Sequence, residues 1–407
     1  MSTPSPPMPP FNKTSTLSPS FASLIAPLEG QLPHITPLES KSNRPLRFSF
    51  DYQVRALIYY HTEAFTSAQD LLQATANDPL ARELMVPEQG LGQSTFYEAN
   101  QSRGLVQMIE LMDRLSKKVT KRLKIAFPEL GRLKAIDGSL IEATLSMDWA
   151  DYTTTTNKAK AHMGFDLNRG IPRTMQLTQG KAGERPFVST LLDQGETAVL
   201  DRGYQDHRRF DTWIDEGKHF VARVKNNTRY QVIEELSFEK GSGIFFFAKV
   251  HLGNEAHRSQ HELYLVGFRC RGKRYLVVTD RADLAAHEIA FIFSLRWQIE
   301  TFFAWWKQYL KVYHLISRNE HGVLLQLLAG LITYLLLVLY FEVKYGERPS
   351  IARLRQLRWQ MRQEVFGQQA ARQNVPIVVI LPLVWLVPTA GGPWERPRKF
   401  LTGNCWI

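Results

Sequence analysis

The spacing of hydrophobic and polar positions changes twice along the chain. From Phe50 to about residue 125, apolar residues recur every three or four positions, which predicts several short helices. From Lys134 to about residue 280, short apolar runs alternate with polar residues and end in Gly-containing turns, which predicts strands with a few helices between them. Helical spacing then returns. The pattern predicts an α/β core that lies between two helical regions.

One segment of the last region combines a long apolar run with a cluster of charges. Residues 291–311, FIFSLRWQIETFFAWWKQYLK, fit a single amphipathic helix. With Arg296 at zero and about 100° per residue, Glu300 falls at about 40° and Lys307 at about 20°, so the charges form a narrow stripe. An i,i+4 ion pair is the ordinary explanation. Because Arg before Glu is the less favourable order for such a pair, a functional explanation stays open.

Residues 322–341, GVLLQLLAGLITYLLLVLYF, are long and apolar enough to span a bilayer. Gln326 is the one strongly polar residue among them. The segment follows the charged helix directly and has no second apolar segment of similar length beside it in the sequence. We therefore predict a helix that is buried inside the protein, with a membrane-associated protein as the alternative.

The charge of the chain favours a polyanionic partner. The 407 residues carry a formal net charge of +11, which points first to nucleic acid and second to an anionic membrane surface. No basic and apolar leader is recognisable at the N-terminus, so we expect a cytoplasmic protein. Ten of the 21 prolines lie in residues 1–45, which are predicted to be extended or disordered.

The helical region 46–130 has features of a DNA-reading domain. A short loop, EQGLGQ, precedes a helix whose start is marked by the capping-box spacing of Thr95 and Glu98. Several lysines and arginines follow, as in a helix-turn-helix reader, and Thr95, Asn100 and Arg103 lie near the start of the expected reading helix. An ordinary solvated helical bundle is the alternative. A second basic helix is predicted within residues 344–372, and it can bind nucleic acid or anionic lipid or simply be solvated.

Two aspartates follow apolar strands at Gly-containing turns, namely Asp137 and Asp201. With Glu300 from a helix packed across the sheet, they form a set of oxygen ligands suited to Mg²⁺ or Mn²⁺. Two such ions about 4 Å apart activate a water or a 3′-hydroxyl for attack on a phosphodiester. The cations Arg296 and Lys307 are then candidates for phosphate contacts. An aspartate after a strand is more often a turn former, and Glu142, Asp148 and Asp166 are alternatives to Asp137.

The order of these residues resembles the DDE transposases of bacterial insertion sequences. The carboxylates Asp137, Asp201 and Glu300 occur in the family's order, and the second belongs to an Asp-Arg-Gly-Tyr motif. Arg296-x3-Glu300-x6-Lys307 matches the Tyr-x2-Arg-x3-Glu-x6-Lys signature of the insertion-sequence-four family. Phe293 stands where that family has tyrosine, so a hydroxyl contact to DNA is in doubt. The resemblance extends from about Phe48 to Gly346.

The resemblance implies an RNase H-like catalytic core with a β-rich insertion before the glutamate, and cut-and-paste transposition with Mg²⁺ or, as the alternative, Mn²⁺. Relatives can cut the second strand through a DNA hairpin that stacks a flipped base on a tryptophan. No tryptophan lies between Trp213 and Trp297, so this step is left open. The implied DNA contacts are Arg296, Lys307, Phe293, Arg202, Tyr204, Thr95, Asn100 and Arg103.

The expected organisation therefore has six parts. They are an extended or disordered segment (1–45), a helical DNA-binding domain (46–130), the first part of the catalytic core (131–225), the β-rich insertion (226–284), the second part of the core (285–345) and a basic helical C-terminal region (346–407). The expected partners are double-stranded DNA, as terminal inverted repeats and as target, and a second copy of the chain in a synaptic complex. We expect a cytoplasmic, nucleoid-associated protein and no membrane. A transposase-derived DNA-binding protein without transposition activity is the alternative.

Overall fold

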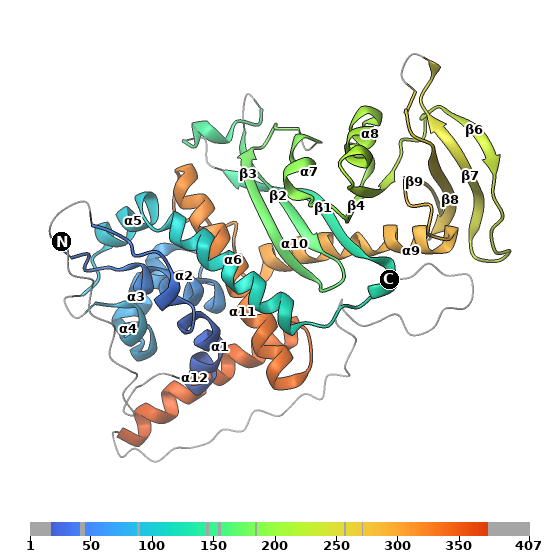
Figure 1. The fold of residues 1–407 in the computed structure, drawn as a ribbon. Helices are drawn as coiled ribbons and strands as arrows, with labels where there is room; N and C mark the ends of the chain where they lie inside the picture. Colours follow the sequence, from blue (N-terminus) through green and yellow to red (C-terminus); the bar gives the residue numbers. More distant parts are fainter. Residues whose placement is uncertain are drawn as a thin grey trace. The chain divides into compact units, whose positions relative to one another are not determined.

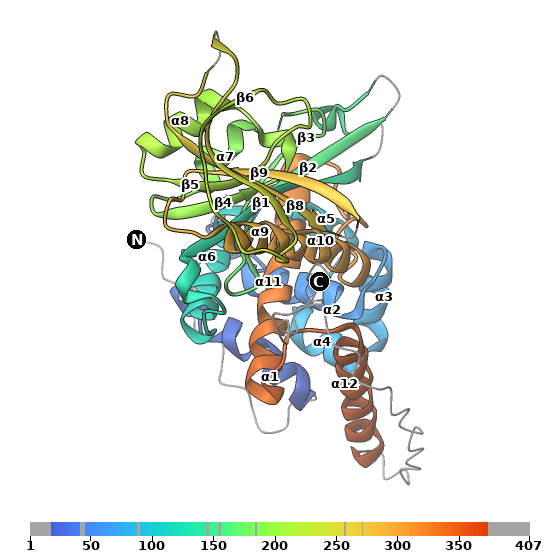
Figure 2. The same cartoon turned by 90° about the vertical axis from the view of Figure 1, so that its right-hand side faces the viewer.

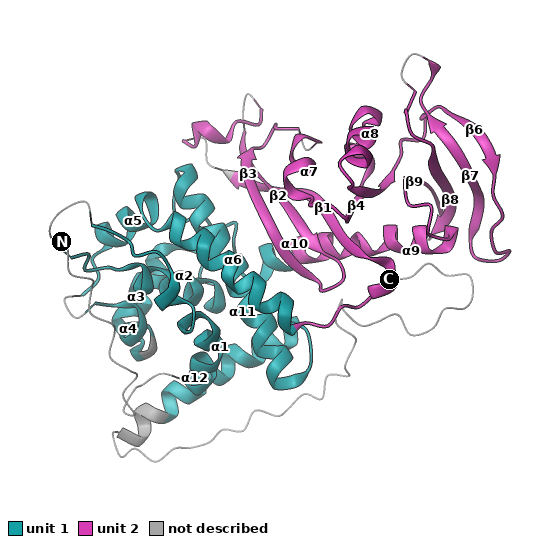
Figure 3. Cartoon of the chain, in the orientation of Figure 1, with its two compact units in different colours: residues 1–122, 304–392 teal, residues 123–303, 393–407 magenta. Residues whose placement is uncertain are grey.

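The computed structural model describes residues 18–372, except for residues 41–44, 88–89, 144–145, 154–155, 184, 256–257 and 271. The chain divides into two compact units (Figure 3). Unit 1 comprises residues 1–122 and 304–392, and unit 2 comprises residues 123–303 and 393–407. The division after residue 303 cuts through the predicted second part of the core, 285–345. The predicted C-terminal stretch after residue 372 lies outside the described residues.

The described part of unit 1 is helical (Figure 1). Its long helix α11 (Glu320–Tyr345) contacts α1, α2, α5 and α6. The remaining elements are α1 (Pro19–Glu29), η1 (Leu32–His34), α2 (Phe50–Glu63), α3 (Ala68–Asn77), α4 (Pro79–Met85), α5 (Gln93–Ser102), α6 (Leu105–Arg122), the later part of α10 (Trp297–Tyr309) and α12 (Ile351–Arg372).

Helix α11 has the length and hydropathy of a membrane span, but 94% of its most apolar stretch is buried inside the protein. The prediction of a buried helix is confirmed. Gln326 is the polar exception, and its side chain is satisfied: it accepts from the backbone N–H of Ile316 at 2.8 Å and donates to the carbonyl of His314 at 2.8 Å. A buried amide with both partners carries no desolvation penalty of the kind that an unpaired one would have.

Helix α1 corrects the prediction that residues 1–45 are extended or disordered. Ser18 caps the helix through the backbone N–H of Phe21, and Pro19 occupies a first-turn position where its missing N–H is harmless. Phe21, Leu24 and Leu28 recur at helical spacing and are fully buried. The high proline content concealed this capped, amphipathic segment.

The β-structure of unit 2 forms one nine-stranded sheet in the order β3-β2-β1-β4-β5-β9-β8-β7-β6. Strands β1, β4 and β5 are parallel, and the others pair antiparallel with their neighbours. The strands are β1 (Arg132–Ala143), β2 (Asn157–Asp166), β3 (Ile171–Gln179), β4 (Glu196–Leu200), β5 (His219–Arg223), β6 (Tyr230–Glu235), β7 (Ile244–Leu252), β8 (Leu263–Cys270) and β9 (Lys273–Thr279).

Helices cover both faces of this sheet (Figures 1 and 2). Helices α7 (Arg185–Leu191) and α8 (His207–Asp215) lie on one face, over a core that includes Ile136, Leu200 and Phe210. Helix α9 (Ala286–Leu295) lies on the other face and contacts β4, β5, β7, β8 and β9. The 3-10 turns of unit 2 are η2 (Pro128–Leu130), η3 (Asp148–Ala150) and η4 (Arg202–Tyr204).

The segment predicted as a β-rich insertion continues the sheet. Strand β9 pairs with β5, so β9, β8, β7 and β6 extend the same nine-stranded sheet. The insertion therefore shares a surface with the core strands, and side chains can run in one row from the core into the insertion.

Candidate active site

The two predicted aspartates lie on neighbouring parallel strands. Ala135 of β1 pairs with Val199 of β4 as the last pair of that ladder. Asp137 lies two residues beyond Ala135, and Asp201 lies two residues beyond Val199, directly after β4. Because side chains alternate along a strand, both carboxylates point to the same face of the sheet.

The environment of Asp137 differs from the prediction that a strand ends there. Strand β1 continues to Ala143, because it pairs with β2 over its whole second half, with Asp137 opposite Met163. What ends near Asp137 is the pairing with the shorter strand β4. The carboxylate is half-buried and accepts a hydrogen bond from the backbone N–H of Gly138 at 2.9 Å. It thus lies where β1 loses one neighbour.

Helix α10 packs on the face that carries both aspartates. Phe165 of β2 is the partner of Ala135, so it shares the face of Asp137. The Phe165 ring lies 5.2 Å from the ring of Phe302 on α10. Glu300 precedes Phe302 by two residues, so the third predicted carboxylate lies on the helix that covers this face of the sheet.

The predicted single helix over residues 291–311 is divided at Arg296. Helix α9 ends at Leu295 and α10 begins at Trp297. Around the junction the backbone bonds shorten to i→i−3: the N–H of Arg296 donates to Phe293 at 3.2 Å, and that of Ile299 donates to Arg296 at 3.1 Å. Such a tightened turn interrupts the α-helical hydrogen bonding without proline or glycine.

Arg296 is the partner of Glu300. Its Nη1 lies 2.6 Å from Glu300 Oε1, and only 9% of the Arg296 side chain is exposed. The guanidinium lies over the Phe293 ring, with Cζ 5.6 Å from the ring centroid, and its buried Nε has no hydrogen-bond partner among the described residues. The ordinary explanation, an i,i+4 ion pair, is confirmed for these two residues.

A second arginine pairs with Asp201, and the sequence analysis missed it. Arg223 ends β5, and its Nη1 lies 3.4 Å from Asp201 Oδ1. Leu200 of β4 pairs with Ala222 of β5, so Asp201 and Arg223 are the next residues along two parallel strands. The available signal was a cation at the end of the apolar strand HFVAR, in the same position relative to its strand as Asp201.

The carboxylates fit a divalent metal by donor type. Asp137, Asp201 and Glu300 offer only oxygen ligands, which Mg²⁺ and Mn²⁺ prefer. The structure holds Asp201 and Glu300 on arginines instead, and within the described residues no three His, Cys, Asp or Glu are close enough together to hold a metal ion. Binding of a metal would therefore require these carboxylates to exchange guanidinium partners for the ion.

The alternatives to Asp137 have local partners. Asp166 accepts from the backbone N–H of Arg169 at 2.9 Å and pairs with its guanidinium at 3.1 Å, as a turn-forming aspartate does. Glu142 is exposed and pairs with Lys158 at 2.8 Å. Asp148 lies in η3, which contacts β2 and β3.

The predicted DNA contacts of unit 2 differ in exposure. Arg202 is exposed. Tyr204 is only 1% exposed and belongs to the core on the α7 and α8 side, and Phe293 is 6% exposed. The structure therefore corrects the expectation for these two rings, which pack inside the protein. Trp297 is 50% exposed and one helical turn from Glu300, and the sequence analysis did not select it.

The predicted DNA contacts of unit 1 also differ in exposure. Helix α5 begins at Gln93 after Gly92, so Thr95 lies inside its first turn and is no cap. Asn100 is 2% exposed, and its side chain bonds the carbonyl of Phe96 at 2.8 Å and the amide of Gln53 at 3.3 Å. Asn100 therefore links α2 to α5 through its hydrogen bond with Gln53.

Arg103 and Lys307 are the remaining predicted cations of unit 1. Arg103 is half-buried, follows α5 directly and has a buried Nε without a partner among the described residues. Lys307 lies on α10, in the part of that helix that belongs to unit 1.

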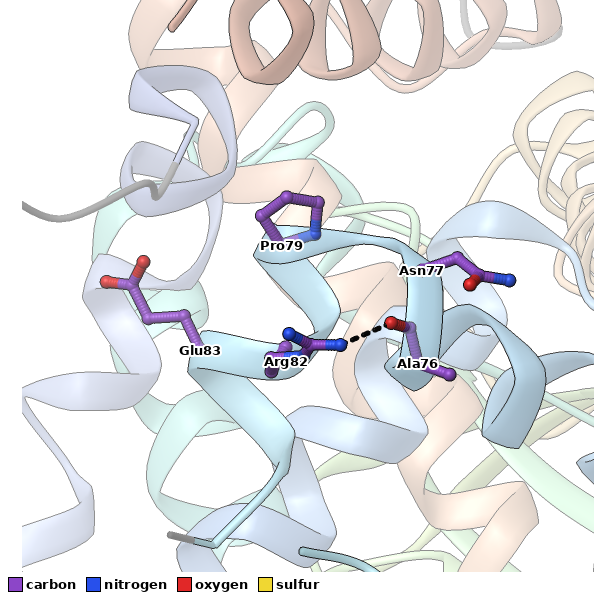
Figure 4. A pocket seen from close by; sticks show the side chains of 5 residues that line it. All are labelled: Ala76, Asn77, Pro79, Arg82 and Glu83. Atoms are coloured by element: carbon purple, nitrogen blue, oxygen red, sulfur yellow. Dashed lines mark hydrogen bonds between the residues drawn. The ribbon is translucent and has the colours of Figure 1, made fainter. Parts of the chain in front are cut away.

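A cavity of about 240 Å³ lies between α3 and α4 (Figure 4). It is lined by Ala76, Asn77, Pro79, Arg82 and Glu83, and the Arg82 guanidinium donates to the carbonyl of Ala76. None of the residues predicted from the sequence lines it, so this cavity is not the candidate active site.

Comparison with known proteins identifies the class. The family model "Transposase DDE domain" matches residues 129–336, about half of the chain, and the chain belongs to this family. The matched span contains all three carboxylates. The resemblance to the DDE transposases of bacterial insertion sequences is thereby confirmed.

Individual relatives are named as transposases of insertion sequences. A transposase for insertion sequence element IS5377 of Geobacillus stearothermophilus is 28% identical over 236 residues, which is 57% of this chain and 62% of that protein. A transposase for element IS4SA of Synechocystis is 25% identical over 275 residues, 65% of this chain and 76% of that protein. The chain thus spans less than two thirds of the first of these relatives.

Among solved structures, the piggyBac transposase synaptic complex with hairpin DNA covers 90% of this chain and 80% of its own, at 10% identity and a TM-score of 0.41. A similarity of this size supports no conclusion about the chain.

Proposed function

We propose that the chain is the transposase of an insertion sequence and that it cuts and joins DNA through Asp137, Asp201 and Glu300. The observation that carries the proposal is the shared face of Asp137 and Asp201 on neighbouring parallel strands, with the Glu300 helix packed on that same face. A carboxylate set assembled from two strands and a helix is suited to a divalent ion at a scissile phosphate.

The strand order supports an RNase H-like core as the finer description of the fold. Strands β3, β2 and β1 form an antiparallel meander, and β4 and β5 continue the sheet parallel to β1. In this strand order Asp137 and Asp201 come from neighbouring strands, β1 and β4, although about 60 residues separate the two aspartates in the sequence.

Transposases of the DDE family generally use divalent metal ions, and Asp137, Asp201 and Glu300 would hold Mg²⁺, or Mn²⁺, here. The bound ion would activate the attacking oxygen and stabilise the leaving oxygen of the phosphodiester. Arg223 and Arg296 balance the charges of Asp201 and Glu300 as long as no ion is bound.

The DNA contacts are proposed from the exposed cations and one exposed ring. Arg202 follows Asp201 directly and can reach a phosphate, and Lys307 is the cation of the signature on α10. Trp297 offers an exposed indole, one turn from Glu300, on which an unpaired base can stack. Thr95 and Arg103 remain candidates for recognition of terminal inverted repeats by unit 1.

The proposed reaction is cut-and-paste transposition, with excision at terminal inverted repeats and strand transfer into target DNA. A dimer of the chain would synapse two element ends, in the cytoplasm at the nucleoid. A transposase-derived DNA-binding protein without cleavage activity is the second candidate. It is favoured by Phe293, which is buried where the resembled family has a tyrosine, and by the arginine partners of Asp201 and Glu300.

The test uses purified full-length chain and a labelled duplex that carries the inverted repeat found beside its coding region. The proposal predicts nicking at the repeat end with Mg²⁺ or Mn²⁺, none with chelator, and none on a duplex with a scrambled repeat. Specific binding of the repeat without nicking, in both metals, would favour the second candidate.

A further inference from the structure

The row of side chains at the candidate site continues into the β-rich insertion. Arg223 of β5 pairs with Val277 of β9, so the side chain two residues before Val277 is its diagonal neighbour on the same face. That residue is Tyr275, and the Arg223 guanidinium carbon lies 5.0 Å from the centre of its ring. The insertion thereby contacts the arginine that holds Asp201.

Tyr275 belongs to a group of three rings, Phe268, Tyr275 and Phe293, here called the aromatic platform. Phe268 and Tyr275 are cross-strand partners on β8 and β9 and stack with ring centres 5.4 Å apart and planes 14° apart. Phe293 of α9 packs on both, with ring centres 6.0 Å from Tyr275 and 6.2 Å from Phe268. The platform joins the insertion to α9.

The platform also contacts the second arginine. Phe293 lies under Arg296, with the guanidinium carbon 5.6 Å from its ring centre, and Arg296 holds Glu300. A continuous path of contacts therefore runs from one catalytic carboxylate to the other: Asp201, Arg223, Tyr275, Phe293, Arg296 and Glu300.

We propose that Tyr275 is a positioning residue of the active site, and that the insertion sets the orientation of Asp201 and Glu300 through it. This inference rests on the proposed function. A guanidinium is planar and lies well on an aromatic face, so a ring fixes the plane of the arginine as well as its distance. A carboxylate bound to a fixed guanidinium is in turn restricted to a narrow set of orientations.

The partly desolvated position of both arginines strengthens these contacts. The exposed fraction of the side chain is 24% for Arg223 and 9% for Arg296. Cation–π contacts gain strength when water is excluded, so the rings hold the guanidinium groups more firmly than they would at an open surface. The Tyr275 hydroxyl is not needed for this, because the face of the ring makes the contact.

The first experiment compares single-turnover cleavage of the repeat duplex at saturating DNA. Tyr275→Leu should lower the rate by about 10- to 100-fold, the effect of a small misplacement of catalytic groups, with DNA affinity unchanged. Tyr275→Phe keeps the ring and should cleave within about twofold of the parent. The control is Tyr264→Leu, because Tyr264 is a half-buried tyrosine of the same insertion whose ring packs on Phe247, 6.3 Å away.

Three results would overturn the proposal: parental cleavage by Tyr275→Leu, an equal loss in Tyr264→Leu, or a failure of Tyr275→Phe to retain activity. Arg223→Lys tests the same contact with the rings intact, because lysine keeps the charge and lacks the planar group. Arg223→Lys should lose cleavage to the same extent as Tyr275→Leu. If Tyr275→Leu does not fold, the cleavage rate of Arg223→Lys tests the proposal in its place.

The second experiment does not need cleavage. Urea unfolding midpoints of Arg223→Ala, Arg296→Ala and the double variant should be non-additive in the parent, because the two side chains share the platform. The midpoints should become additive in the Tyr275→Leu background. Additivity in both backgrounds would overturn the proposal. A parent that does not cleave DNA but shows the non-additivity would contradict the proposed function and leave the platform in place.

Discussion

Glu300 and Asp201 each pair with an arginine. Removal of such a paired arginine should change the stability of the protein, whereas removal of an exposed cation should change DNA binding. Arg296 is buried on Phe293 and forms an ion pair with Glu300, so it acts within the protein. Arg202 is exposed beside Asp201 and is available to DNA. The resemblance implied that both arginines contact DNA, but their different burial predicts different roles for them.

Arg296→Ala should lower the free energy of unfolding by about 1–3 kcal/mol, because it removes the ion pair of a buried arginine and leaves Glu300 without this partner. Arg202→Ala should leave the free energy of unfolding unchanged within about 0.5 kcal/mol. It should instead reduce the salt dependence of DNA binding by about 0.9 in log–log slope, the value for one phosphate contact. Urea titration and binding at several salt concentrations measure both. Equal stability of the two variants would contradict the assignment.

His61 makes the stability of unit 1 depend on pH. Its ring nitrogens lie 2.6 Å from the carbonyl oxygen of Leu310 and 3.2 Å from that of Gln326, and burial lowers its pKa to about 4 from 6.5, although both carbonyls favour the charged ring. The unfolded chain takes up a proton below about pH 6.5 that the folded chain takes up only near pH 4. Stability is therefore full above about pH 6.5 and falls between these values.

Protonation of His61 should lower the free energy of unfolding by about 3 kcal/mol, at 1.36 kcal/mol per pKa unit. Urea unfolding between pH 7.5 and 4.5 measures it, with His61→Gln as the comparison. In His61→Gln, the slope of the free energy of unfolding against pH should be smaller by the contribution of about one proton. His162, whose pKa burial also lowers to about 4, should still contribute to this slope. An unchanged slope in His61→Gln would show that this ring titrates normally in the folded chain.

At the scale of elements, the sequence pattern predicted most element types correctly but misplaced two ends. Asp137 lies within β1, because pairing with β2 extends the strand, and a single strand's pattern contains no information about its partner's length. The helix of residues 291–311 is divided at Arg296 by a tightened turn that no proline or glycine marks. The contact of Arg223 with Tyr275 was not predictable, because it depends on the register of β5 with β9.

Helix α1 gives a prediction for the segment that composition had assigned to disorder. Phe21 is fully buried, and Ser18 and Ser20 donate to the Glu364 carboxylate of α12. Phe21→Ala should destabilise the protein by about 3–5 kcal/mol, as truncation of a buried aromatic does. Ser23→Ala, on the exposed side of α1, should stay within about 0.5 kcal/mol of the parent. Thermal or urea unfolding checks both, and an equally mild effect of Phe21→Ala would mean that α1 does not dock in solution.

At the scale of the whole molecule, the three carboxylates all belong to unit 2, and the β-rich insertion extends the same sheet. The order of strands and helices in this unit could be predicted from the short apolar runs, whereas the roles of the three carboxylates stay predictions. The domain boundaries stay predictions. The burial of α11 makes the membrane alternative unfavourable, since its apolar side chains already have protein neighbours.

The central claim is that Asp137, Asp201 and Glu300 carry the chemistry, and amide variants test it most directly. Purified Asp137→Asn, Asp201→Asn and Glu300→Gln are compared with the parent and with Glu262→Gln, whose side chain is 52% exposed on the insertion and pairs with Lys249. We predict that each of the three loses Mg²⁺-dependent nicking of the terminal-repeat duplex while binding it like the parent, and that Glu262→Gln nicks normally. Parental nicking by Asp201→Asn or Glu300→Gln would contradict the account.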